Sequence, residues 1–317
     1  MKENSTLGTI NEKYVILQKL GEGAYSTVYK VTNKETNEIY AIKVIHRYNK
    51  NEMEINKELK SLNSPYIVKF YDFSQGEIVL PDEAEADFKP YFVFELSDKG
   101  QLKNYINIGR NGFDEKHCKM IFYEILKAFQ IIHNNYICHR DIKAENVLLN
   151  TDKYEIKICD FGFSSETYDM LDGYFGTKQY MAPEIIMDKR YDGIKADIFS
   201  LGVLLFYIRT ASFLFEQAKL SNGVNPKTAY DYIKEKNGKV WEMIKINPLD
   251  ELSGDFKELI FRMLAFNPKE RPSVDEILKD EWMKEISNLP DDERQKLKED
   301  LIKEFKKREE IMESQNN

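Results

Sequence analysis

The order in which two kinds of sequence pattern occur along the chain constrains its fold more than any other feature. Up to about residue 95, apolar residues come in short runs separated by polar turn residues, as in antiparallel hairpins. From Gln101 onward they recur at helical spacing, as at Ile121, Ile125 and Phe129. A chain in which strands come first and helices follow builds an α+β fold. We therefore expect two lobes, a small β-rich one over about residues 14–96 and a larger helical one over about 97–283.

The expected elements of the first lobe follow from these runs. Strands are predicted at 14–17, 28–31, 39–45, 67–73 and 91–95, and an acidic loop at 81–87. A helix is predicted at 51–62, because Ile55, Leu59 and Leu62 fall on one face of a helix.

Composition excludes several classes of partner and location. The 317 residues carry a net charge of −8, so binding to nucleic acid or anionic membrane through a general basic surface is not expected. The three cysteines form no C-x-x-C pair, which fits a reducing compartment. No apolar run approaches the ~20 residues that span a bilayer. We expect a cytoplasmic protein, with the nucleus as an alternative, and no membrane partner.

A charged segment, residues 284–317, follows the second lobe. Its apolar residues Leu297, Leu301, Phe305 and Met312 are spaced nearly as on one face of a helix. This helix could dock on the larger lobe, stay solvated, inhibit the protein or bind a regulatory partner. Alternating glutamate and lysine dilute the basic character that calmodulin targets show, so docking or solvation is favoured.

A glycine-rich turn joins the first two long strands. The segment reads G-x-G-x-x-S-x-V from Gly21 to Val28, between two strands. Glycines let a backbone bend sharply and approach a polyphosphate closely. A dinucleotide-binding turn would open a helix instead, so that interpretation is disfavoured. An ordinary hairpin explains this segment equally well when it is taken alone.

A polar segment in the second lobe carries more specific chemistry. It reads H-R-D-I-K-A-E-N from His139 to Asn146, and the hairpin that follows it ends at Asp160-Phe161-Gly162. A carboxylate can accept a proton from a hydroxyl nucleophile, a lysine can stabilise a transferred phosphoryl group, and an amide oxygen can bind a metal. Magnesium prefers carboxylates together with substrate phosphates.

These motifs together resemble those of the eukaryotic protein kinase family, from about Tyr14 to Met283. The glycine loop, the strand lysine Lys43, the H-R-D-x-x-x-x-N loop, D-F-G and A-P-E all occur in the family order. The resemblance implies a protein kinase fold and transfer of the γ-phosphoryl group of ATP to protein hydroxyls, with Mg²⁺. The loop from Asp141 to Lys143 and the segment from Gly176 to Glu184 match the serine/threonine form.

By the same resemblance, individual residues receive roles. Asp141 is the catalytic base, Lys143 contacts the γ-phosphate, Lys43 anchors the α/β phosphates, and Asn146 and Asp160 hold magnesium. Thr177 bonds to Asp141 and Lys143, Glu184 pairs with Arg271, and Asp197 anchors the catalytic loop. The nucleotide-binding residues implied are Leu20, Gly21, Glu22, Gly23, Ala24, Tyr25, Ser26, Thr27, Val28, Ala41, Lys43, Glu95 and Ser97.

The sequence departs from the family pattern at the glutamate that pairs with Lys43. Counting back from Pro65, the in-register residue is Ile55. Glu54 is the preferred partner, with a one-residue insertion after it. Glu58 shares a helix face with Glu54 and stays open as the alternative.

The sequence leaves open whether the protein is catalytically active and how its activity is controlled. The alternative to an active enzyme is a catalytically inactive binding module on the same fold, since a fold alone does not fix function. The motifs look most similar to those of the calmodulin-dependent and AMP-activated kinase group. Arg140 in such kinases pairs with a phosphorylated residue of the loop 160–184, and we expect Asp172 to supply part of that charge here.

Overall fold

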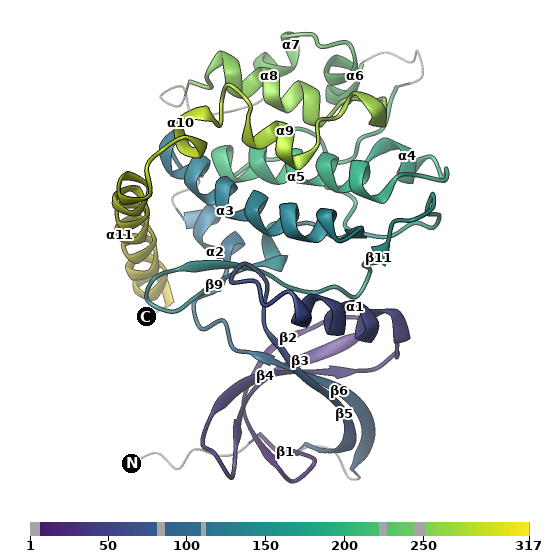
Figure 1. Cartoon of the computed structure of the whole chain (residues 1–317), viewed down its shortest axis with the longest axis vertical. Coiled ribbons are helices and arrows are strands. Elements are labelled where there is room, and N and C mark those ends of the chain that lie inside the picture. The colour runs from purple at the N-terminus through teal and green to yellow at the C-terminus, as the bar shows by residue number, and fades with distance from the viewer. Residues whose placement is uncertain (1–6, 81–85, 109–111, 222–226, 244–250, 317) are drawn as a thin grey trace. The chain divides into compact units, whose positions relative to one another are not determined.

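The computed structural model describes residues 7–80, 86–108, 112–221, 227–243 and 251–316. Contacts within the chain divide it into two units, Met1–Asp98 and Lys99–Asn317. The first is built mainly of strands and the second mainly of helices, so the predicted α+β, two-lobed fold is confirmed. Each unit is described by itself (Figure 1).

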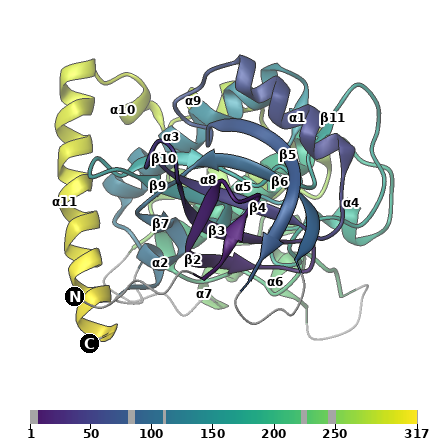
Figure 2. The same cartoon turned by 90° about the horizontal axis from the view of Figure 1, so that it is seen from below.

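The first unit is a closed antiparallel barrel, in which the strands are ordered β1-β2-β3-β4-β6-β5. Their curvature is visible in Figure 2. The strands are β1 (Thr9–Ile10), β2 (Tyr14–Glu22), β3 (Ser26–Asn33), β4 (Ile39–Ile45), β5 (Phe70–Val79) and β6 (Asp87–Glu95). The predicted strands are present; β4 has the predicted bounds, the others are longer than expected, and β5 begins three residues later than predicted. Residues 81–85 of the predicted acidic loop lie outside the described residues.

The interior of the barrel is filled by alternate side chains of its strands. Along β3 every second residue is buried, from Thr27 to Asn33, because successive side chains of a strand point to opposite faces. Branched residues such as Ile16, Val31 and Ile42 are fully buried in the core. The pairing of β1 with β5, Ile10 opposite Ile78, closes the barrel. A strand of two residues has too little sequence pattern to be predicted.

One helix, α1 (Lys50–Ser61), belongs to the first unit and matches the predicted helix within one residue at each end. Asn49 caps it, since its side chain accepts a hydrogen bond from the backbone N–H of Asn51 at 3.1 Å. Its buried face consists of Glu52, Ile55, Asn56 and Leu59.

The second unit begins with short strands and continues as helices. Its strands are β7 (Gly100–Gln101), β8 (Ile137–Cys138), β9 (Val147–Asn150), β10 (Glu155–Ile158) and β11 (Ser165–Glu166). Its α-helices are α2 (Leu102–Asn107), α3 (Glu115–Asn134), α4 (Pro183–Ile186), α5 (Gly193–Thr210), α6 (Ala229–Lys234), α7 (Lys239–Met243), α8 (Gly254–Met263), α9 (Val274–Leu278), α10 (Lys284–Ser287) and α11 (Asp291–Asn316). Two 3₁₀ turns, η2 (Ala144–Asn146) and η3 (Pro268–Glu270), complete the described elements.

Helix α5 is the central helix of the second unit. Its apolar run, Leu201–Ile208, is buried throughout. Asp192 caps its first turn by accepting from the backbone N–H of Lys195 at 3.1 Å. Gly202 allows close packing with α8, because a Cβ there would lie 2.9 Å from the Cβ of Met263. This buried helix presents Asp197 to the functional loop described below.

The charged C-terminal segment forms the long helix α11, which packs on its own unit against α2 and α3 (Figure 1). Leu297, Leu301 and Phe305 are buried, whereas Met312 is only half-buried. The ring of Phe305 stacks on that of Tyr154 with centroids 5.1 Å apart. Of the arrangements that the sequence leaves open, the structure shows docking.

Polar contacts near the end of α11 reinforce this docking. Arg308 donates to the backbone carbonyls of Tyr105 at 2.8 Å and Gly112 at 2.6 Å. Glu309 accepts from the ammonium of Lys99 at 3.2 Å and from the hydroxyl of Tyr154. Since one carbonyl belongs to α2 and the other lies shortly before α3, α11 is bonded to both ends of the connection between these helices.

In the described part of the chain, no helix combines the length and the apolar character that a membrane crossing requires. Cys118 and Cys138 are free thiols. Burial raises the pKa of Cys118 and of Cys138.

Candidate active site

The loop from His139 to Asn146 is held in place by the carboxylate of Asp197. This carboxylate is 1% exposed and accepts the backbone N–H groups of His139 at 2.7 Å and Arg140 at 2.9 Å. The ring nitrogen Nε2 of His133 lies 3.0 Å from the same carboxylate. Arg140 has a left-handed backbone, with φ +63°, so the chain turns sharply just before Asp141. The anchoring role expected for Asp197 is confirmed.

His139 links this loop to the strand that leads to Asp160. Its Nδ1 accepts the backbone N–H of Asp141 at 3.2 Å, and its Nε2 lies 3.0 Å from the carbonyl oxygen of Cys159. Because a carbonyl can only accept, Nε2 carries the proton and the ring is the neutral tautomer. The ring of Phe161 packs on His139 with centroids 5.0 Å apart.

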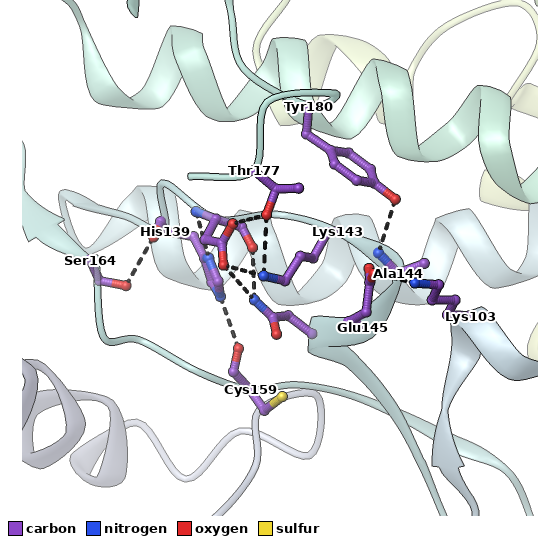
Figure 3. Close-up of polar contacts among 11 residues, drawn as sticks. Lys103, His139, Lys143, Ala144, Glu145, Cys159, Ser164, Thr177 and Tyr180 are labelled. Atoms are coloured by element: carbon purple, nitrogen blue, oxygen red, sulfur yellow. Dashed lines mark hydrogen bonds and ion pairs between the residues drawn. The ribbon is translucent and has the colours of Figure 1, made fainter. Parts of the chain in front are cut away.

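The carboxylate of Asp141 lies at the centre of a dense set of contacts, drawn in Figure 3 with the labelled residues His139, Lys143 and Thr177. Its Oδ2 accepts from the ammonium of Lys143 at 2.6 Å, and its Oδ1 accepts from the hydroxyl of Thr177 at 2.8 Å. Lys143 also donates to the hydroxyl oxygen of Thr177 at 3.2 Å. The predicted contacts of Thr177 are confirmed, and Asp141, at 5% exposure, is held in one orientation.

Asn146 and Asp160 are the predicted metal ligands. The Nδ2 group of Asn146 donates to the carbonyl of Asp141 at 2.8 Å, which leaves its amide oxygen as the ligand atom. The backbone N–H of Cys159, the residue before Asp160, donates to the carbonyl of Asn146 at 3.0 Å. Within the described residues no group of three or more His, Cys, Asp or Glu could hold a metal. One amide and one carboxylate suit magnesium that arrives with substrate phosphates.

The A-P-E segment is fixed by a buried ion pair. Arg271 is 1% exposed and binds Glu184 through two parallel hydrogen bonds of 2.6 and 2.7 Å. Arg271 also donates to the backbone carbonyls of Ala265 and Lys195, both at 2.9 Å. The predicted pairing of Glu184 with Arg271 is confirmed.

In the first unit, the predicted partner of Lys43 is wrong. The ammonium of Lys43 donates to Oε1 of Glu52 at 2.5 Å, and both side chains are largely buried. Glu54 points to solvent and pairs with Lys50 at 3.0 Å. Counting back from Pro65 fails because Ile55 occupies the in-register position. The carboxylate comes instead from Glu52, one helical turn earlier on the same face.

The glycine turn is formed by the end of β2 and the start of β3. The backbone N–H of Gly23 donates to the carbonyl of Ser26 at 2.9 Å. Neither Gly21 nor Gly23 has a positive φ, and a Cβ on either would have no neighbour closer than 3.9 Å. The backbone therefore does not itself require glycine here. The open space beside it fits close approach of a ligand such as a polyphosphate.

The remaining predicted nucleotide-binding residues lie on β4, on or just beyond β6, or in the turn around the two glycines. Ala41, on β4, pairs with Phe94 on β6, and the backbone N–H of Glu95 donates to the carbonyl of Lys69 at 2.9 Å. Ser97 lies two residues beyond β6, and within the described residues its hydroxyl has no hydrogen-bond partner. The turn residues Leu20, Glu22, Ala24, Tyr25, Thr27 and Val28 flank the two glycines.

Sequence reasoning missed Glu52, although a signal existed. Ile55 and Leu59 define the buried face of α1, and Glu52 lies three residues before Ile55 on that face. A helical projection of 50–61 alone, without family spacing, indicates Glu52 as the buried carboxylate.

Comparisons with known proteins agree with this geometry. Residues 14–283 match the family described as protein kinase domain. The chain is 31% identical to serine/threonine-protein kinase SRK2D of Arabidopsis thaliana, over 89% of this chain and 74% of that protein. It is 29% identical to SRK2E of the same plant, with the same coverage. It is 32% identical to the carbon catabolite-derepressing protein kinase of Candida tropicalis, over 88% of this chain and 42% of that protein.

The buried catalytic loop, the paired lysine of β4 and the family match define this chain as a member of the protein kinase family. Within it, the chain falls among the serine/threonine kinases related to the calmodulin-dependent and AMP-activated group, as its motifs predict.

Proposed function

We propose that this protein transfers the γ-phosphoryl group of ATP to serine and threonine hydroxyls of protein substrates. The observation that carries the proposal is the Asp141 carboxylate, which Lys143 and Thr177 hold in one orientation. The Arabidopsis relatives are serine/threonine-protein kinases, which supports serine and threonine as the acceptors. Since Asp141, Lys143, Asn146 and Asp160 are all present, the inactive binding module is the weaker alternative.

The proposed step is an in-line displacement. The acceptor oxygen forms a bond to the γ-phosphorus, the bond from that phosphorus to the β–γ bridging oxygen breaks, and ADP leaves with the electron pair. The hydroxyl proton passes to Asp141. Its Oδ1 accepts one hydrogen bond, from Thr177, and retains acceptor capacity, whereas its Oδ2 accepts from both Lys143 and Asn146. Lys143 stabilises the negative charge on the transferred group, so catalysis rests on positioning and electrostatics.

Magnesium would be held by Asn146 and Asp160 together with the phosphates, where it neutralises phosphate charge. In the first unit, Lys43 would bind phosphate oxygens, and Glu52 orients its ammonium. The open backbone at Gly21 and Gly23 would cover the phosphates. We place this activity in the cytoplasm, with no nucleic-acid partner.

The proposal is tested with purified chain, Mg²⁺, ATP and three peptides that differ only in a Ser, Thr or Tyr acceptor. We expect phosphoserine and phosphothreonine peptides by mass spectrometry, with one ADP formed per phosphopeptide. ATP hydrolysis without phosphopeptide, or phosphate on the tyrosine peptide alone, would refute it.

A further inference from the structure

The side chain of Arg140, the residue directly before the proposed catalytic base, has an unusual partner. Its Nε donates to the carbonyl of Phe163, and its backbone N–H donates to Asp197. Within the described residues no carboxylate forms an ion pair with its guanidinium. The expectation that Asp172 supplies a charge here is wrong, because Asp172 is exposed and forms no ion pair with Arg140.

An aromatic ring lies on the guanidinium instead. The guanidinium carbon of Arg140 lies 4.7 Å from the ring centroid of Phe175. That distance is within the ~6 Å over which a cation is attracted to an aromatic face. The ring of Phe175 also packs against that of Phe163, with centroids 5.6 Å apart. Phe175 thus occupies the position at which a charged partner of Arg140 would be expected.

The backbone on both sides of Phe175 is suited to this contact. Gly173 has φ +89°, and a Cβ there would lie 2.4 Å from the Phe175 ring. Gly176 has φ +109°, and a Cβ there would lie 2.6 Å from the carbonyl oxygen of Arg140. Both positions therefore require glycine for the ring to lie on Arg140.

The contact is connected directly to the catalytic residues. Thr177, two residues after Phe175, donates to the carboxylate of Asp141. Arg140, Asp141, Phe175 and Thr177 line one small cavity of about 10 Å³, close to the smallest space that holds a water molecule.

We propose that Phe175 is a positioning residue that orders the loop 160–184 on Arg140, so that the protein is active without phosphorylation of that loop. The inference rests on the proposed kinase function, and it assigns to an uncharged ring the ordering that a phosphate would otherwise supply. Phe175 acts through Arg140 and Thr177 on Asp141.

The experiment starts from full-length protein treated with phosphatase, with mass spectrometry confirming that the loop is bare. Phe175→Leu removes the ring, and Phe175→Trp keeps an aromatic face. Tyr168→Leu is the matched control, because Tyr168 lies in the same loop, is 71% exposed and makes a tilted ring contact with Tyr136 rather than with Arg140. Peptide kinase kinetics and hydrogen exchange of the amides of 171–181 are measured for each.

We expect bare wild type and Tyr168→Leu to be fully active and protected from exchange at 171–181. Phe175→Leu should lose at least tenfold in kcat with the KM for ATP within twofold, and should lose that protection. Phe175→Trp should retain kcat within about threefold. A variant that simply fails to fold would melt at a lower temperature and would change both kcat and the KM for ATP. The expected result differs, because only kcat changes.

Failure of the inference differs from failure of the proposed function. Bare wild type that is inactive but gains activity when Ser165, Thr167 or Tyr174 is phosphorylated would overturn the inference alone. So would Phe175→Leu with wild-type kcat and exchange. A protein that transfers no phosphate in either state overturns the proposed function, and exchange at 171–181 then still decides whether Phe175 orders the loop.

Discussion

In the first unit, the ion pair between Lys43 and Glu52 shows how one carboxylate fixes the orientation of the Lys43 ammonium. Lys43 is 12% exposed and Glu52 is 7% exposed, so both charges have left most of their water. Removing one partner of such a pair weakens the compensation of the other buried charge, which is costly. Glu54, only two residues away, carries the same charge on the solvent side of α1.

We predict that Glu52→Gln lowers kcat/KM for ATP by roughly 10- to 100-fold. A hydrogen bond to a charged group contributes about 1.5–3 kcal/mol, and each 1.4 kcal/mol corresponds to about a tenfold change. Glu54→Gln is the matched control and should change kcat/KM less than twofold, since exposed i,i+4 pairs contribute little. Equal effects of the two substitutions, measured by steady-state kinetics, would contradict the pairing in the structure.

At the scale of elements, α11 is an integral part of the second unit. Phe305 is fully buried and contacts the rings of Tyr105, Phe113 and Tyr154. Three of the four apolar residues expected on its stripe are buried. Alternating charges, which suggest solvation when the segment is read alone, pair with α3 instead, as Lys298 does with Glu124 at 2.7 Å.

Phe305→Ala should destabilise the protein by about 3–5 kcal/mol, because it removes a fully buried aromatic ring and leaves a cavity. Phe88→Ala makes the same chemical change at a site that is 66% exposed, and it should cost less than about 0.5 kcal/mol. Thermal and urea unfolding compare the two. If Phe305→Ala unfolds like wild type, α11 is not docked in solution.

A histidine of α3 that contacts α11 should make this stability depend on pH. Burial lowers the pKa of His117, but the hydrogen bond and charge of Asp114 and the charges of Asp300 and Glu304 raise it above its ordinary value overall. Burial alone would raise the pKa of Asp114, yet its hydrogen bonds from His117 lower it to about 2. His117 Nε2 lies 3.4 Å from Asp300 on α11, and Lys116 also pairs with Asp300 at 3.2 Å.

The sign of the effect follows from these directions. A raised histidine pKa contributes stability that is fully present below about pH 6.5 and is lost as pH rises through the folded pKa. The contribution of Asp114 is present above about pH 4 and is lost as pH falls toward 2. His117→Gln should therefore lower the melting temperature most near pH 5.5, and the deficit should shrink toward pH 8. A deficit that is constant from pH 5 to 8 would contradict this account.

For the whole molecule, the sequence predicts most of the fold because its signals are local and repeated. Strand runs, the apolar run of α5 and the stripe of α11 each follow from periodicity, and the catalytic loop follows from its motif. Glu52, the contact of Phe175 with Arg140 and the closure of the barrel by β1 do not. The Phe175–Arg140 contact and the pairing of β1 with β5 depend on where distant segments meet. Glu52 is missed because the family spacing assigns the wrong helix position.

The most direct test of the central claim is the rate of phosphoryl transfer by Asp141→Asn. The amide keeps the shape of the side chain but cannot accept the acceptor's proton as the carboxylate does. Asp169→Asn is the control, because Asp169 is an exposed aspartate of the loop 160–184. Both variants should melt within a few degrees of wild type, which shows that any loss is catalytic.

We predict that Asp141→Asn lowers kcat by roughly 10²- to 10⁴-fold, the range for a positioned general base, while Asp169→Asn stays within twofold of wild type. Rapid-quench measurement of phosphopeptide formation under single-turnover conditions separates this step from product release. A folded Asp141→Asn protein that transfers phosphate at near wild-type rate would contradict the assignment of Asp141 as the base and, with it, the proposed mechanism.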